Sequence, residues 1–145
     1  MIYSDKLSMQ EVYLDIKFDR DFHILTRTAK GEANGLPDMC YAGIVDCVLN
    51  RVRKQKAHWG LNAKDVCLAD GQYDYWARTN LEFLSYYYIK DIIKIVEQTI
   101  NDYGKGFDIT NGATHYHTLD TMPYWAVGKT PCHDDLGHFY YNNIA

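Results

Sequence analysis

The strongest constraint on the fold is a change in sequence pattern at Gly104. Before it, apolar residues recur with the spacing of amphipathic helices, as at Ile93, Val96 and Ile100. After it, short aromatic pieces are separated by turn-forming residues, namely Asn111-Gly112, Pro123, Gly128, Pro131 and Gly137. This order predicts an α+β domain, with helices first and then a small hairpin face that walls a groove.

Caps and helix breakers set the expected bounds of three helices. Asp21 is a candidate N-cap for the first helix, which should fray from Gly31 and stop at Asn34-Gly35. The second should begin at Leu36-Pro37, because proline is favoured in a first helical turn, and should run to about Arg53. The third is expected from residue 81 to about residue 103.

Two other segments lack a helical pattern. Residues 57–78 are expected to form a loop with short turns. Residues 1–20 are expected to form a short strand or an irregular arm, because apolar residues alternate at Val12, Leu14 and Ile16.

Size and charge exclude several classes of function. The 145 residues suffice for one domain with its own core, and 15 Lys and Arg against 19 Asp and Glu argue against nucleic acid as a partner. No stretch is apolar enough to span a bilayer, and the N-terminus lacks a secretory signal pattern. We therefore expect a monomer that is made in the cytoplasm and binds neither nucleic acid nor membrane.

The four cysteines predict mainly reduced thiols. Cys40 and Cys47 fall on one predicted helix, where a separation of about 10 Å is too long for a disulfide. A disulfide between Cys67 and Cys132 stays open from the sequence alone.

Glu32 is the first candidate for chemistry. It lies near the end of the first predicted helix, and Gly31 beside it would let a polymer approach closely. Glycoside hydrolysis needs a carboxylic acid that is still protonated near neutral pH, and partial burial or a negative helix end favours that form. A solvated glutamate is the plainer interpretation of the same local sequence.

The segment Asn111–His117 is the second candidate. Strand alternation would put Thr114 and Tyr116 on one side and His115 and His117 on the other, where they could bond sugar hydroxyls and amides. Trp125, further on, is suited to stacking on a sugar ring, and the 13 tyrosines of the chain suit such a groove, although a compositional bias explains them as well.

Two other chemistries stay open. Possible zinc ligands occur in the same region, although without a recognised spacing: His115, His117, Cys132, His133 and His138. A Cys-His peptidase is the weaker alternative, because the chain has no Gly-x-Ser-x-Gly motif and its cysteines have no distinctive signature.

Taken in order, four blocks of the sequence resemble the SleB/CwlJ-type cell wall hydrolases, the spore-cortex-lytic enzymes and their bacterial and phage relatives. Thr28 to Gly35 looks like the family's Ala-Arg-x-x-x-x-Glu-Ala-x-Gly block, and Met39 to Val52 closes in the same Asn-Arg-Val. A weaker match covers 65–76. The fourth block is 111–117, followed by Pro123-x-Trp125-Ala126 and Gly137-His138. The residues Cys132-His133-Asp134-Asp135 are an unfamiliar insertion in that pattern.

The resemblance implies a lysozyme-like, lytic-transglycosylase-like single domain over residues 23–145, preceded by an N-terminal arm over residues 1–22. It implies cleavage of glycan strands of peptidoglycan between N-acetylmuramic acid and N-acetylglucosamine, without a cofactor or metal, by a protein that acts on the cell wall and is possibly phage-encoded. Glu32 would be the general acid and then the general base. The expected substrate-binding residues are Gln72, Trp76, Thr114, His115, Tyr116, His117, Trp125, His138 and Tyr140.

Two competing functions remain. One is a zinc-dependent peptidoglycan amidase or peptidase that uses His115, His117 and His138. The other is a wall-binding module without catalytic activity.

Overall fold

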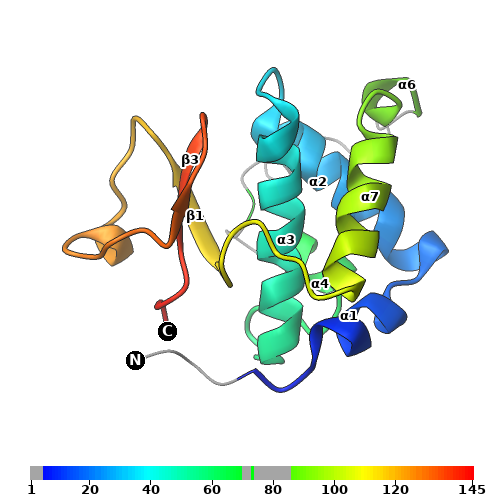
Figure 1. The fold of residues 1–145 in the computed structure, drawn as a ribbon, viewed down its shortest axis with the longest axis horizontal. Coiled ribbons are helices and arrows are strands. Elements are labelled where there is room, and N and C mark those ends of the chain that lie inside the picture. The colour runs from blue at the N-terminus through cyan, green and yellow to red at the C-terminus, as the bar shows by residue number, and fades with distance from the viewer. Residues whose placement is uncertain (1–4, 70–72, 74–85) are drawn as a thin grey trace.

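The computed structural model describes residues 5–69, 73 and 86–145. Six α-helices and one three-stranded sheet make up most of the described chain (Figure 1). The helices are α1 (Met9–Asp15), α2 (His23–Ala33), α3 (Asp38–Lys54), α4 (Ala63–Leu68), α6 (Tyr86–Ile89) and α7 (Ile93–Gly104). The strands are β1 (His115–Thr118), β2 (His133–Asp134) and β3 (His138–Tyr141). The predicted α+β fold is confirmed, and no described helix meets the length and hydropathy needed to cross a bilayer.

Helix α3 is the centre of the core. It packs against α1, α2, α4 and α7, and most of its side chains are buried. The helix begins directly after Pro37, whose fixed φ suits that position, and ends where Gln55 turns left-handed with φ 52°. The predicted second helix is therefore confirmed to within about two residues at each end.

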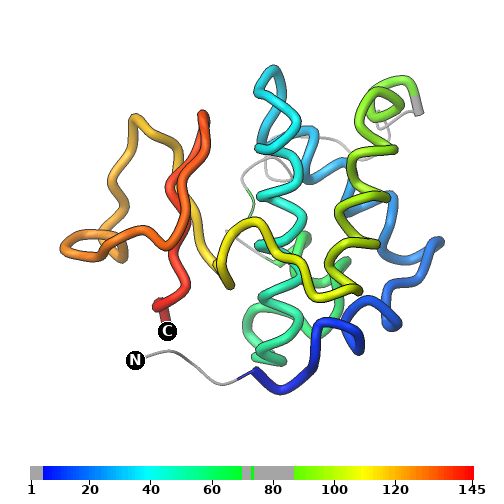
Figure 2. Tube along the Cα trace, viewed as in Figure 1, coloured from blue at the N-terminus to red at the C-terminus, as the bar shows by residue number. Residues whose placement is uncertain are grey.

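The sheet lies on one side of the helices, and the loop between β1 and β2 extends away from them (Figures 1 and 2). Its strands are antiparallel in the order β1-β3-β2, and Tyr116 of β1 pairs with Tyr140 of β3. Tyr140 is fully buried against Gly43 of α3, where any larger residue would collide with the phenol ring. Gly43 thus allows the sheet to approach α3 closely.

The expected strand or irregular arm at the N-terminus is wrong. Ser8 and Glu11 form a capping box, each side chain bonding the other's backbone N–H at 3.0 Å, and this starts helix α1. Val12 is buried in the main core, whereas Leu14 is 63% exposed, so the two do not share a strand-like face. The division of the chain at residue 22 into an arm and a catalytic domain stays a prediction.

The sequence suggested Asp21 as the N-cap of the first predicted helix, but Asp21 does not cap α2. It lies in a short π-helical turn, η1 (Phe18–Phe22), and its buried carboxylate accepts the backbone N–H groups of Lys17 and Lys64 and the guanidinium of Arg20. The carboxylate thereby ties the start of α2 to α4, a long-range contact that local sequence does not reveal.

Two further bounds differ from expectation. Residues 63–68 are helical rather than loop, because Asn62 caps α4 by accepting the N–H of Asp65 at 2.9 Å. The predicted third helix is interrupted between α6 and α7 at residues 90–92, and its part before residue 86 lies outside the described residues. Its end at Gly104 is confirmed.

Asp46 of α3 should make the stability of the fold depend on pH. Burial, followed by the charge of Asp108, raises the pKa of its carboxyl to about 8, against about 4 in an unfolded chain. A raised folded-state pKa gives stability that is fully present below about pH 4 and is lost as the pH rises through about 8. We expect the free energy of unfolding of Asp46→Asn, measured by urea denaturation, to equal that of the wild type at pH 4. At pH 8 it should exceed the wild-type value by about 1 kcal/mol or more.

Asp38→Asn is the matched control, because Asp38 is exposed on the same helix. The free energy of unfolding of the Asp38→Asn protein should depend on pH in the same way as that of the wild type. An Asp46→Asn protein that lost stability at pH 8 would contradict the buried, proton-holding carboxyl.

Candidate active site

Glu32 lies in the last turn of α2 and is half-buried. The helix ends one residue later, and the N–H of Leu36 bonds the carbonyl of Ala33 at 3.0 Å to close the turn around Gly35, whose φ is 82°. Thr28, one helical turn before Glu32, bonds its own helix through the Ile24 carbonyl. The predicted position of Glu32 near the end of a helix against a glycine turn is therefore confirmed.

Two tyrosines share the electrostatic environment of Glu32. Burial is the main cause that raises the pKa of Tyr73 and of Tyr116, and the negative charge of Glu32 raises both further. The two rings lie 6.2 Å apart, centre to centre. The charge of Glu32 thus acts on a residue of β1, which links the two segments that sequence analysis singled out.

Asn50 and Arg51 of α3 hold β1 in this position. The Asn50 amide donates to Asp108 at 2.7 Å and to the Ala113 carbonyl at 2.9 Å, in the loop that leads into β1. Arg51 is 5% exposed and donates to the Thr114 carbonyl. These buried bonds fix the backbone of β1 over the middle of α3.

Arg51 also brings a positive charge to the site. Its guanidinium lies 5.7 Å from the ring centre of Tyr73 and 5.3 Å from that of Trp59. The charge lowers the pKa of Tyr73, which opposes the larger effect of burial. A buried cation beside two aromatic rings can stabilise negative charge nearby.

The opposite face of β1 carries His115 and His117, as the alternation predicted. His115 lies between Trp59 and Trp125, with ring centres 5.3 and 5.2 Å away. Burial, with the charge of Arg51 next, lowers the pKa of His115 to about 3, so the ring is neutral at physiological pH. His117 is buried and shares a 2.8 Å bond with the Tyr141 hydroxyl.

His138 and Tyr140 of β3 lie on the same face as Tyr116. His138 is fully buried, with its ring edge-on to Tyr116 at 4.9 Å. The Tyr140 hydroxyl donates to Asp135 at 2.8 Å. Burial alone would raise the pKa of Asp135, but bonds from His138, Gly137 and Tyr140 lower it well below its usual range.

The predicted substrate-binding residues therefore divide into three groups. Half-buried side chains, which remain candidates for contact with a glycan, are His115, Tyr116 and Trp125. Buried side chains, for which the structure favours a supporting role, are Thr114, His117, His138 and Tyr140. Gln72 and Trp76 lie outside the described residues. Trp125 contacts the histidine face of β1 rather than Tyr116, so nothing in the described residues brings it to Glu32.

Sequence analysis missed three residues that build this region: Trp59, Tyr73 and Tyr141. Trp59 and Tyr73 fall in a segment that was expected to be loop, and both are nearly fully buried. The available signal was the presence of two large aromatic residues in a predicted loop, because aromatic side chains are usually buried and such a loop must then pack against the rest of the fold.

The histidines proposed for zinc do not converge. His115 and His117 lie on one face of β1, whereas His138 lies on the Tyr116 face of the sheet. Among the described residues, the potential metal ligands that do gather are Cys40, Asp135 and His138. All four cysteines are free thiols, so Cys67 and Cys132 form no disulfide.

Comparison with known proteins identifies the family. A sequence profile of the family described as cell wall hydrolases matches residues 39–141, most of the chain, although the match begins after Glu32. The crystal structure of the catalytic domain of the Bacillus cereus SleB protein superposes with a TM-score of 0.70 at 20% identity, over 87% of this chain and 92% of that chain. At this identity the likeness shows the fold, and no curated protein matches the sequence. By the profile match, with the resemblance of the sequence blocks confirmed, the chain belongs to the cell wall hydrolase family.

Proposed function

We propose that this enzyme cleaves the glycan strand of peptidoglycan between N-acetylmuramic acid and N-acetylglucosamine, as a lytic transglycosylase with Glu32 as its one acid and base. The observation that carries the proposal is the half-buried position of Glu32 in the last turn of α2, where its charge raises the pKa of Tyr73 and of Tyr116. Membership of the cell wall hydrolase family supports peptidoglycan as the substrate.

The reaction needs one proton donor that later accepts a proton. Protonated Glu32 donates to the glycosidic oxygen, the bond from that oxygen to C1 of the muramyl sugar breaks, and the glucosamine leaves as a free alcohol. The carboxylate then removes the proton of the muramyl C6 hydroxyl as that oxygen closes onto C1. The product is a 1,6-anhydro sugar, and no water is consumed.

A second catalytic carboxylate, which a hydrolytic route would need, has little support. Asp108 is occupied by bonds from Asn50, Thr110 and Gly112 in the loop before β1. Asp120 is exposed and accepts the Thr118 hydroxyl in a turn. Asp74, a carboxylate within the weaker matched block at 65–76, lies outside the described residues.

Tyr116 is a neutral donor that the charge of Glu32 reaches. The raised pKa of Tyr116 keeps its hydroxyl protonated, so it can donate to a sugar oxygen or to the carboxylate. Arg51 adds a fixed positive charge behind Tyr73. We assign Tyr116 to positioning of the substrate beside Glu32.

Mass spectrometry of the fragments released from purified sacculi tests this function. The proposal predicts glycan fragments with intact peptides and 1,6-anhydro ends. Reducing ends would replace it with hydrolysis, and freed peptides with intact glycan would revive an amidase or peptidase. Binding to sacculi without any release would indicate a wall-binding module.

A further inference from the structure

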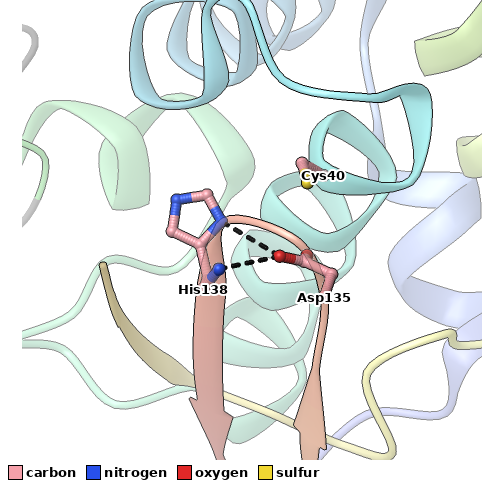
Figure 3. Close-up of side chains that lie close together, drawn as sticks. All are labelled: Cys40, Asp135 and His138. Atoms are coloured by element: carbon pink, nitrogen blue, oxygen red, sulfur yellow. Dashed lines mark hydrogen bonds and ion pairs between the residues drawn. The ribbon is translucent and has the colours of Figure 1, made fainter. Parts of the chain in front are cut away.

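We propose that Cys40, Asp135 and His138 form a structural zinc site that fastens the sheet to helix α3. Cys40 belongs to the first turn of α3, Asp135 to the turn between β2 and β3, and His138 is the first residue of β3 (Figure 3). Their sulfur, oxygen and nitrogen atoms all lie within 4.8 Å of one another. The site is separate from Glu32 and goes beyond the proposed glycan cleavage.

The spacing of the three groups is compatible with three of the four ligands of a zinc centre. With zinc bonds of about 2.0–2.3 Å, neighbouring ligand atoms stand roughly 3.3–3.6 Å apart. The Nδ1 atom of His138 lies 3.6 Å from Oδ1 of Asp135. That distance is too long for a hydrogen bond, and it sets the imidazole beside a carboxylate whose other oxygen, Oδ2, accepts only the Tyr140 hydroxyl and still has a position open for an ion.

The surroundings of the His138 ring point to a bound ligand. The His138 side chain is fully buried, neither ring nitrogen makes a hydrogen bond among the described residues, and the contact of Nδ1 with Asp135 is only a long ion-pair distance of 3.6 Å. Buried polar atoms without a partner are costly and uncommon. Nδ1 is turned toward the Asp135 carboxylate (Figure 3), so an ion at the cluster would satisfy it.

Asp135 has room for one more partner. Its Oδ1 accepts the N–H groups of Gly137 and His138, and its Oδ2 accepts the Tyr140 hydroxyl, each at 2.8 Å. A carboxylate offers about four such positions, which leaves one. The Cys40 sulfur lies within 4.8 Å of this carboxylate, and zinc would take the place of the thiol proton.

The sulfur lies in surroundings that suit a bound thiolate. The turn between β2 and β3 packs directly on Sγ of Cys40, which lies 3.6 Å from the position that a Cβ at residue 137 would take. One thiolate and one carboxylate would also balance the charge of Zn²⁺ in a buried place. A mixed sulfur, nitrogen and oxygen set favours zinc over magnesium or calcium, which prefer oxygen ligands alone.

The location indicates a structural rather than a catalytic metal. The side chains of Asp135 and His138 are fully buried, so a polymer cannot reach the ion. Leu136, between them, is 67% exposed, so the turn that carries Asp135 lies at the surface. An ion therefore has only a short path from solvent to the site. Zinc there would link two segments that are almost a hundred residues apart in the chain.

Metal content and thermal unfolding of the tag-free full chain test the proposal. After chelation and incubation with Zn²⁺, we expect one zinc per chain after desalting. At a zinc concentration 100-fold above Kd, we expect Tm to rise by about 5–10 °C. Substitution with Co²⁺ should give a thiolate-to-cobalt charge-transfer band. Neither measurement involves glycan cleavage, so failure here leaves the proposed function untouched.

Three variants sharpen the test. Cys40→Ala should lose the zinc, the Tm shift and the cobalt band, whereas Cys132→Ala, a thiol outside the cluster, should keep all three. If Cys40→Ala does not fold, Asp135→Asn replaces it, because an amide still accepts the backbone N–H groups but binds zinc weakly. Wild-type protein that binds no zinc, or a Cys40→Ala protein that binds zinc as well as the wild type, would overturn the site.

Discussion

Replacing Glu32 by glutamine should reduce the release of soluble fragments from sacculi by about 10³-fold or more. Glutamine keeps the size of the side chain and its ability to form hydrogen bonds, but it can act neither as the general acid nor as the general base of the reaction. A positioned acid or base contributes about 10²- to 10⁴-fold, and the proposed mechanism uses Glu32 in both roles. The initial rate of fragment release, measured at equal protein concentrations, gives the ratio.

Glu97→Gln is the matched control, since Glu97 is exposed on α7. Its rate should equal that of the wild type. Thermal unfolding of both variants should stay within about 2 °C of the wild type, because half-buried and exposed Glu-to-Gln changes disturb little packing. A Glu32→Gln enzyme with the wild-type rate would refute the assignment of the acid, whatever its stability.

Replacing Arg51 by methionine should cost about 2–3 kcal/mol of folding free energy and lower Tm by roughly 5–10 °C. Methionine fills much of the space of the arginine stem but leaves the buried Thr114 carbonyl without its donor. The contacts of the guanidinium with Trp59 and Tyr73 are also lost. The Thr114 carbonyl also holds β1 in place. The rate of fragment release should therefore fall even at temperatures where the Arg51→Met protein is still folded.

Arg53→Met provides the comparison from the same helix. Arg53 pairs with Asp5 at 3.1 Å near the surface and donates to the Leu7 carbonyl. Exposed pairs of this kind contribute about 0–1 kcal/mol, so denaturant unfolding should separate the two variants clearly. Equal losses for the two arginines would mean that Arg51 does not anchor β1.

The parts of the fold that were predictable are those set by local chemistry. Pro37 marks the start of α3, and Gly104 marks the end of α7, because each acts through its own backbone. The alternation of residues 114–117 also held, since side chains in any strand point to opposite faces. The position of Glu32 followed from the glycine turn at Gly35.

The parts that were missed depend on contacts distant in sequence. Val12 looked like part of a strand, but the capping box at Ser8 and the core around α3 favour a helix. Thr114 and His138 looked like sugar-binding residues, yet the sheet packs so closely on α3 that both are buried. Burial of a polar side chain depends on what covers it, and the covering residues come from α3 and β3.

The central claim is that one carboxylate cuts the glycan and that the sugar's own C6 oxygen, not water, attacks C1. Digestion of sacculi in H₂¹⁸O tests it most directly, because each new end records the source of its oxygen. Our account predicts new muramyl ends that are lighter than a hydrated end by one water and carry no ¹⁸O. Ends that each contain one ¹⁸O atom would show that water attacks, and would require a second catalytic carboxylate.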